Sequence, residues 1–557
     1  MPMLLTRGAT MALALCLAPP ALAAGVAVMP PLSYPTAQFL AANPQARARL
    51  LSGLATRPMA ALAPTAHRFV PAKGGTWTAV TAAPRSGLCT PELMTDGTVL
   101  FQSCNTKYWL KLTPDAKGNY TDGSWTTIAT LPVINGTQYA PQYHAAAVLP
   151  DDRLIIMGGE YNGSSSGVWT NLGAIYDPVA NSWTPVTAPG GSSWSQIGDA
   201  QSTVLANGTF MLASCCANPA TDALLDASTL TWTTTGAPTA GDNYQDEQGY
   251  ELLPTGDVLT LDVWTNYPNY GATNAESYLP SSGTWGAAGN STASLVDPCG
   301  YWEIGPAVLR TNGTVVGFGA NTGCTTPADP TSVYNVKANS WSAGPNVPQV
   351  CGSGGTSGCT LADAPAALEP NGRILFAASS GFGSPPTHFF EFLPNNTIVQ
   401  VTDPLYNASQ SGAYYYNLMV LPSGQIMMTD FSSQAEIYTP IGKPTTHEMP
   451  VIKKVPTTIT RGTSYTVAGS QLNGLSQGAF YGDDAQMATN YPMVRITNTA
   501  TGDMFYARTS GFSAMSVKAG QFSHASFVLP TTAETGASTL VVVADGVAST
   551  PVNVTVD

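Results

Sequence analysis

Acidic and aromatic residues recur at one position of a motif that the chain repeats seven times. The motif is an apolar strand, a two-residue turn that usually ends in Gly, and a second apolar strand, as in LMTDGTVLF, LLPTGDVLT and LEPNGRILF. Seven positions before the residue that precedes each turn stand, in chain order, Leu88, Tyr143, Asp199, Glu247, Ile304, Asp363 and Tyr415. The neighbouring positions add Cys89, His144, Asp246, Glu303, Tyr414 and Tyr416. Because Asp and Glu make up only 34 of 557 residues, chance would rarely place so many carboxylates at this register.

Three kinds of chemistry fit such a register. Clustered carboxylates can bind a hard cation such as Ca²⁺ through their oxygens. They can instead raise one another's pKa and supply the two carboxyl groups of glycoside hydrolysis, with Glu247 and Asp363 as acid and base and Asp199 as an orienting carboxylate or cation ligand. The third interpretation is structural, with each carboxylate accepting backbone N–H bonds from a neighbouring repeat. Tyr143 and Tyr414 are candidate substrate contacts, because aromatic faces stack on the CH surfaces of sugars.

The repeats also predict the elements that position these residues. Asn-Gly and Asp-Gly turns supply the positive φ angles of tight hairpins, so each motif is expected to be a β-hairpin, recurring about every 54 residues. A short turn and a strand containing Trp follow most hairpins, as at Trp125 and Trp183, and an extra copy at Trp77 precedes the first hairpin. We therefore expect an all-β chain with a seven-bladed kelch-type β-propeller over residues 68–440, whose N-terminal strand completes the last blade. The strand that enters each hairpin is then the innermost one, and the acidic register opens on a central funnel.

The regions outside the repeats have their own patterns. Residues 1–23 contain Arg7, a short apolar run and Ala21-Leu22-Ala23 before Ala24, which is typical of a cleaved signal peptide and predicts a secreted or periplasmic protein. Residues 24–67 form an arm rich in Ala and Pro. Residues 441–557 contain alternating segments such as TSYTVAG, MVRITN, HASFVLP and TLVVVAD, which predict a C-terminal immunoglobulin-like β-sandwich.

Composition excludes several classes of partner. The chain has 21 Lys plus Arg against 34 Asp plus Glu, a formal net charge of −13, whereas binding to nucleic acid needs clustered basic residues. No stretch approaches the roughly 20 apolar residues that span a bilayer. We expect a monomer that acts on a small molecule or a glycan.

The cysteines indicate disulfides. Cys16 lies in the predicted signal peptide, and the remaining eight are an even number in an oxidising compartment. Spacing favours three pairs, Cys89 with Cys104, Cys299 with Cys324, and Cys351 with Cys359. Cys215 and Cys216 are adjacent, so they either form a vicinal disulfide or each find a distant partner, and the sequence does not choose.

The hairpins, the Trp strands and the C-terminal strands together resemble the galactose oxidase and glyoxal oxidase superfamily over residues 70–557. That resemblance implies a mononuclear copper held by two tyrosines and two histidines, with one tyrosine cross-linked to a cysteine. Tyr143 in QYHAAAVLPDD has the register of the cross-linked tyrosine, and Cys89 in GLCTPELMTDG stands near the position of the cysteine. Tyr414 and Tyr415 in GAYYYNLMVLPSG correspond to the second tyrosine and its neighbour.

The chain departs from the superfamily at both histidines. Tyr415 stands where a histidine would follow the second tyrosine, and the segment QGAFYGDDAQMATNYPMVRI, which corresponds to a C-terminal loop reaching into the propeller, has Asp483 and Asp484 but no histidine. Cu²⁺ favours imidazole over shells of carboxylates alone, so these replacements argue against copper, while calcium stays compatible with them. Asp483 and Asp484 then become candidate metal ligands.

We therefore expect an acidic, tyrosine-lined centre that binds or processes a carbohydrate or polyol. Tyr414, Tyr415, Tyr416, Glu303, Asp246 and His144 are the candidate substrate contacts. Two alternatives stay open, a copper-radical oxidase with unorthodox ligands and a non-catalytic cell-surface module that binds glycans. The same propeller carries many functions, so the fold alone does not choose among them.

Overall fold

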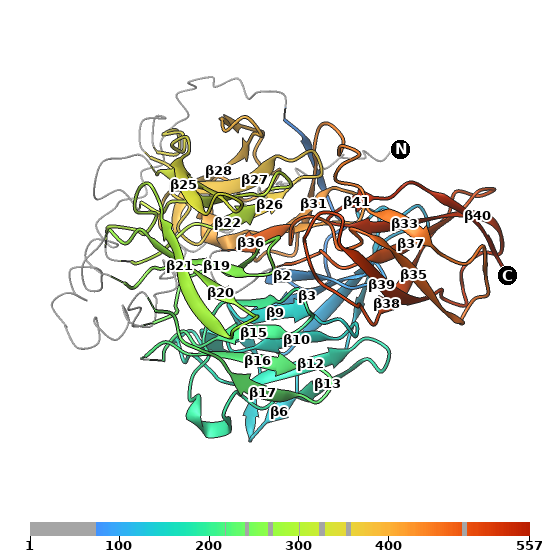
Figure 1. Ribbon diagram of the computed structural model, residues 1–557, viewed down its shortest axis with the longest axis horizontal. Coiled ribbons are helices and arrows are strands. Elements are labelled where there is room, and N and C mark those ends of the chain that lie inside the picture. Colours follow the sequence, from blue (N-terminus) through green and yellow to red (C-terminus); the bar gives the residue numbers. More distant parts are fainter. Residues whose placement is uncertain are drawn as a thin grey trace, which may run out of the picture. The chain divides into compact units, whose positions relative to one another are not determined.

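Seven β-sheets follow one another along the chain in the computed structural model (Figure 1), which describes residues 74–217, 219–239, 244–265, 271–299, 301–321, 329–352, 358–481 and 487–557. The predicted signal peptide and arm, Cys324, Asp483 and Asp484 lie outside these residues. The first strands of successive sheets contact each other in a closed ring, in the order β2, β9, β14, β18, β22, β26, β30 and again β2. This is the seven-bladed propeller that the hairpin repeats predict, with the strand that enters each hairpin innermost.

Each blade has four antiparallel strands, which run in chain order from the centre outward except that β1 is the outermost strand of blade 7. Blade 1 contains β2 (Leu88–Leu93), β3 (Val99–Ser103), β4 (Trp109–Thr113) and β5 (Ser124–Thr127). Blade 2 contains β9 (Ala145–Val148), β10 (Leu154–Met157), β12 (Gly173–Asp177) and β13 (Ser182–Pro185). Blade 3 contains β14 (Ser202–Val204), β15 (Phe210–Ala213), β16 (Asp222–Asp226) and β17 (Thr231–Thr234). Blade 4 contains β18 (Glu251–Leu252), β19 (Val258–Leu261), β20 (Asn274–Leu279) and β21 (Thr284–Asn290).

The last three blades complete the ring. Blade 5 contains β22 (Ala307–Leu309), β23 (Thr314–Phe318), β24 (Thr331–Asn335) and β25 (Ser340–Ala343). Blade 6 contains β26 (Pro365–Leu368), β27 (Ile374–Gly381), β28 (Ser384–Phe392) and β29 (Ile398–Gln400). Blade 7 contains β30 (Asn417–Val420), β31 (Ile426–Thr429), β32 (Glu436–Thr439) and, as its outermost strand, β1 (Thr76–Ala79). Trp77 of β1 pairs with Tyr438 of β32, so the prediction that an N-terminal strand completes the last blade is confirmed.

Short elements lie between the blades. They are the strands β6 (Val133–Ile134), β7 (Thr137–Gln138), β8 (Pro141–Gln142) and β11 (Tyr161–Asn162), and the 3₁₀ turns η1 (Gly191–Ser193) and η2 (Ala413–Tyr415). β8 pairs with β11 beside the entry of blade 2. No helix within the described ranges is long and apolar enough to cross a membrane.

The recurring tryptophans link adjacent blades. The indole N–H of Trp183 in blade 2 donates to the carbonyl of Ala129, which follows blade 1, at 2.9 Å. Equivalent bonds run from Trp77 to Thr402, from Trp125 to Thr81, from Trp232 to Thr187 and from Trp341 to Ala288, over 2.7–2.9 Å. In blade 4, Trp285 donates instead to a carboxylate oxygen of Asp222 at 3.2 Å. The second repeat of the sequence therefore marks the hydrogen bonds that hold neighbouring blades together.

Residues after the propeller form a second group of strands. They are β33 (Val451–Lys454), β34 (Thr458–Ile459), β35 (Ser464–Ser470), β37 (Met493–Asn498), β38 (Met504–Ser510), β39 (Phe522–Val528), β40 (Gly536–Ala544), β41 (Val547–Ala548) and β42 (Val552–Val556). The four segments named in the sequence as strands correspond to β35, β37, β39 and β40. The assignment of this C-terminal domain to the immunoglobulin-like class stays a prediction.

One C-terminal segment joins the propeller's inner strands. β36 (Ala479–Tyr481) pairs antiparallel with β26, so Ala366 of blade 6 lies opposite Phe480. The side chain of Gln477 donates to the hydroxyl of Thr203 in blade 3 at 2.8 Å and accepts from the backbone N–H of Leu252 in blade 4 at 3.1 Å. Farther along, the hydroxyl of Tyr491 donates to the carbonyl of Leu93 in blade 1. The described residues on either side of positions 482–486 therefore contact four blades.

Candidate functional site at the centre of the propeller

The predicted register lies at the entry of the inner strands. Tyr143, Asp199, Glu247 and Asp363 come two to four residues before β9, β14, β18 and β26. Three of them have left-handed backbone angles, with φ of 51° at Tyr143, 61° at Glu247 and 49° at Asp363. Non-glycine residues adopt this conformation at a cost of about 1–3 kcal/mol each, and such residues cluster at functional sites. The same special conformation at the entries of three blades therefore marks this end of the propeller as a candidate site.

The structure brings three of the carboxyl groups together. Glu247, Glu303 and Asp363 each present an oxygen, and these oxygens lie within 4.8 Å of one another. The pKa of Asp363 is raised to about 7, mainly by burial and also by the charge of Asp199, although hydrogen bonds with Glu303 and Glu247 oppose the rise. Two carboxyl groups form a hydrogen bond only when one of them carries a proton. We call Glu247, Glu303 and Asp363 the carboxyl cluster.

The carboxyl cluster is enclosed in this structure. Asp363 and Glu247 are each 4% exposed, Glu303 is fully buried, and Asp199 is 4% exposed. The prediction that these carboxylates line an open funnel is therefore not supported by their burial.

A chain of aromatic rings runs beside the carboxyl cluster. It connects four blades and consists of Tyr301, Phe382, Tyr414, Tyr415, Phe431, Tyr143 and Tyr161, with successive ring centroids 5.0, 5.9, 4.2, 5.3, 6.2 and 6.1 Å apart. These separations are typical of favourable aromatic pairs. We call these seven residues the aromatic arc.

Electrostatic contacts tie the aromatic arc to the acids. The pKa of the Tyr161 hydroxyl is raised by burial first, then by Glu160, and also by the charges of Asp199 and Glu247. The pKa of Tyr414 is raised by burial, by Tyr415 and by the charge of Asp363 among others. These hydroxyls are therefore neutral at physiological pH, and that of Tyr161 is hydrogen-bonded with Glu160.

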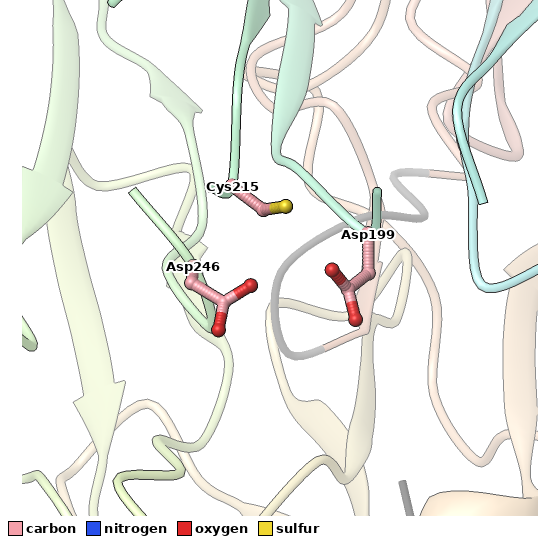
Figure 2. A group of neighbouring side chains, drawn as sticks. All are labelled: Asp199, Cys215 and Asp246. Atoms are coloured by element: carbon pink, nitrogen blue, oxygen red, sulfur yellow. The ribbon is translucent and has the colours of Figure 1, made fainter. Parts of the chain in front are cut away.

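A second cluster lies between blades 3 and 4. Asp199, Cys215 and Asp246 present two carboxylate oxygens and a sulfur within 4.8 Å of one another, and Figure 2 shows both carboxylates turned toward the sulfur. Cys215 forms a vicinal disulfide with Cys216. The structure also pairs Cys89 with Cys104 and Cys351 with Cys359, as spacing favoured, whereas the predicted partner of Cys299, Cys324, lies outside the described residues.

Two predicted substrate contacts, His144 and Tyr416, pack against rings outside the aromatic arc. The ring of His144 is fully buried, with its centroid 6.4 Å from that of Trp109, and burial lowers the pKa of His144 to about 3. Strand alternation turns it away from Tyr143, its neighbour in the chain. Tyr416 is likewise buried and meets Phe389 edge-on at 5.5 Å. Asp246 belongs to the second cluster, and the predicted metal ligands Asp483 and Asp484 lie outside the described residues.

Several site residues escaped the sequence register. Tyr161, Phe382, Phe431 and Cys215 all follow the second strand of a hairpin rather than precede the first. In an antiparallel hairpin the end of the second strand lies beside the start of the first, as Met157 does opposite Ala145. A second register, counted forward from each hairpin, would therefore have found them.

The residues at this centre do not fit the copper that the resemblance implies. Neither of the two clusters contains a histidine. His388 lies on β28, where its Nδ1 is 2.7 Å from Oδ2 of Asp403. His524 lies on β39 of the C-terminal domain. Cys89 is held in its disulfide with Cys104 rather than bonded to Tyr143. Carboxylate and phenol oxygens without imidazole are a donor set for hard cations, so we derive no step through copper.

One family model matches part of the propeller. The Kelch motif model matches residues 141–190, which contain blade 2. No curated protein matches the chain. Among solved structures, a fungal alcohol oxidase of the AA5 family in complex with copper is 14% identical with a TM-score of 0.49, covering 86% of this chain and 99% of that one.

Two further solved structures are similar at lower scores. The GH74 xyloglucanase from Xanthomonas campestris is 10% identical with a TM-score of 0.45, covering 72% of this chain and 60% of that one. A protein of unknown function from Dyadobacter fermentans is 12% identical with a TM-score of 0.36, covering 58% of this chain and 98% of that one. The kelch motif and the seven blades define the class of the protein, a kelch-type β-propeller.

Proposed function

We propose that the protein binds and processes a carbohydrate or polyol at the entry side of the propeller's inner strands. The observation that carries the proposal is the carboxyl cluster of Glu247, Glu303 and Asp363, in which the oxygens lie within 4.8 Å of one another beside the aromatic arc. Carboxyl groups recognise paired hydroxyls, and aromatic faces cover the CH surfaces of a sugar ring. A polyhydroxylated ligand therefore uses both kinds of residue at once.

The protonation of the carboxyl cluster suits glycoside hydrolysis. That reaction needs one protonated carboxyl group to donate to the leaving oxygen and one carboxylate to act as nucleophile or base. Asp363, whose pKa is raised to about 7, carries a proton in about half of the molecules at neutral pH and is the candidate acid. Glu247 is the candidate nucleophile or base, and Glu303 holds the pair in place by hydrogen bonding.

Two variants test this assignment. Asp363→Asn keeps the shape and removes the acid, so we expect turnover of a responsive glycan to fall by about 10²–10⁴-fold with affinity largely kept. Tyr414→Phe keeps the ring and removes one donor, so we expect weaker binding with a smaller effect on turnover. Glu369→Gln, at a buried carboxyl on the hairpin turn of blade 6, is the matched control and should leave both unchanged. Full activity in Asp363→Asn would exclude it as the acid.

The measurement begins with a glycan and polyol panel screened by calorimetry and by release of reducing ends. Binding without turnover would favour the non-catalytic glycan-binding alternative. Hydrogen peroxide production from an alcohol together with stoichiometric metal would instead favour an oxidase. If no compound in the panel binds and none is turned over, the proposal is refuted.

The same oxygens suit a cation as a second candidate function. Three carboxylates this close must either share protons or share a positive charge, and Ca²⁺ accepts such oxygen ligands. If calcium binds there, it should raise the midpoint of thermal unfolding in the wild type and not in Glu303→Gln. An equal shift in both proteins would place the calcium elsewhere.

A further inference from the structure

The second cluster combines two carboxylates with a cysteine sulfur. Asp199 precedes β14, Cys215 follows β15 and Asp246 precedes β18, so three separate segments of blades 3 and 4 supply it. All three residues are buried, and their two oxygens and one sulfur lie within 4.8 Å of one another (Figure 2). A mixed set of two carboxylates and one sulfur differs chemically from the all-oxygen carboxyl cluster.

The backbone beneath Cys215 is built to receive its sulfur. The N–H of Cys215 donates to the carbonyl of Ile197 at 3.1 Å, which places the residue over the turn before Asp199. Gly198 has a φ of +68°, and a Cβ at this position would overlap the sulfur of Cys215 and lie 2.9 Å from the ring of Trp169. Only glycine therefore lets the sulfur approach the two carboxylates so closely.

The disulfide changes what this sulfur can do. In the vicinal bond with Cys216 the sulfur of Cys215 is a poor ligand, because the thiolate is the form that binds metals. Cys215 is fully buried, whereas its partner Cys216 is partly exposed, so a reductant can reach the bond from the side of Cys216. Reduction would add a third negative group to two buried carboxylates, and a dication would compensate that charge.

We propose that the Cys215–Cys216 disulfide masks a divalent-metal site, and that its reduction lets Asp199, Asp246 and the Cys215 thiolate bind Zn²⁺. A dithiol reductant supplies two electrons and two protons: it closes to its own disulfide, the S–S bond opens, and both cysteines become thiols. Zn²⁺ then displaces the proton of Cys215 to the solvent, and water completes a tetrahedral site. With Zn–S near 2.3 Å and Zn–O near 2.0–2.2 Å, tetrahedral donors stand roughly 3.3–3.8 Å apart, so ligand atoms that lie within 4.8 Å of one another need to close by up to about 1.5 Å. This site does not depend on the proposed function.

Cobalt is the probe, because its bond to a thiolate gives a charge-transfer absorption band in the near ultraviolet. Cys216→Ser leaves Cys215 as a free thiol without any reductant, and we expect one Co²⁺ per chain with that band, displaced by Zn²⁺. The matched control, Cys215→Ser, leaves the other thiol free and should show no band, as should the oxidised wild type. Replacing a ligand in Cys216→Ser/Asp246→Asn should weaken binding by at least about tenfold. No thiolate–cobalt band in Cys216→Ser, or equal binding in Cys215→Ser, would overturn the proposal.

A measurement on the wild-type protein covers the case in which a variant fails to fold. After mild dithiol treatment, alkylation followed by peptide mass spectrometry reports each cysteine separately. We expect Zn²⁺ to slow labelling of Cys215 by at least about tenfold and to leave Cys216 reactive, because only the former is a proposed ligand. The same rates with and without Zn²⁺ would overturn the proposal. Cys351 and Cys359, joined in their own disulfide, serve as the internal reference for general unfolding.

Discussion

Glu92 should make the protein less stable as the pH rises. It lies on β2, the inner strand of blade 1, is 1% exposed, and burial alone raises the pKa of its carboxyl from 4.5 to about 8. In the folded protein it therefore keeps its proton at pH 5–8, whereas in the unfolded chain it has lost it. The folded state then binds the extra proton, so the free energy of unfolding falls with rising pH through this window.

The size of the change in unfolding free energy follows from the one proton that Glu92 binds in the folded state and releases on unfolding. Each pH unit between the two pKa values changes the free energy of unfolding by about 1.4 kcal/mol for this single group. From pH 5 to pH 8 the contribution of Glu92 is thus on the order of 4 kcal/mol. Glu92→Gln keeps the shape and a polar end but cannot ionise, so it should remove that part of the pH dependence.

Equilibrium urea unfolding followed by tryptophan fluorescence at pH 5, 6, 7 and 8 measures the effect. The wild type should lose stability at every step, and the difference between Glu92→Gln and wild type should grow by about 1.4 kcal/mol per pH unit in favour of the variant. Asp226→Asn is the control, because Asp226 is exposed and its hydrogen bonds with Ser228 lower its pKa, so it stays ionised throughout. Parallel pH profiles for Glu92→Gln and wild type would refute the reasoning.

Three further predictions concern contacts that hold the blades and the C-terminal domain. Trp183→Phe loses the hydrogen bond to Ala129 between blades 1 and 2 and should cost about 1–2 kcal/mol, seen as a lower urea midpoint. Arg508→Met removes the guanidinium that lies 2.9 Å from the carboxylate of buried Asp152, a carboxyl whose pKa is raised to about 7 mainly by burial. The variant should lose about 2 kcal/mol of unfolding free energy at pH 8 and less at pH 5, where that carboxyl is protonated. An equal loss at both pH values would contradict this prediction. Gly97 has a φ of +79° and lies against the ring of Tyr506 in the C-terminal domain. Gly97→Ala should therefore lose about 2 kcal/mol or more of unfolding free energy in the same assay. An unchanged urea midpoint would show that the contact is absent in solution.

The sequence predicts the ring better than it predicts the site. Hairpin turns and tryptophans repeat with the blades because each blade must make the same turn and the same bond to its neighbour, and Trp77 reveals the closing strand for that reason. Glu247 and Asp363 are found by counting because they share a register. The geometry of the ring determines which acids lie close together at its centre, and the sequence does not give that geometry. The counting misses Tyr161 because this residue follows β10, the second strand of its hairpin. Spacing along the chain likewise does not determine whether Cys215 pairs with Cys216 or with a distant cysteine, because that depends on which sulfur atoms lie close in the folded protein.

The strand that closes blade 7 has a consequence for how the protein is made. Gly75, just before β1, donates its N–H to the hydroxyl of Tyr438 across a sequence separation of 363 residues, at 2.6 Å. Contacts this distant form slowly, because a long loop must be brought together before they are gained. During synthesis six blades can therefore emerge while the ring is still open, and the inner strands of the first and last of these blades then each lack one neighbour. The protein is expected to depend on protection of this open ring until β32 has been added, and a permuted chain that joins β1 directly after β32 should fold faster.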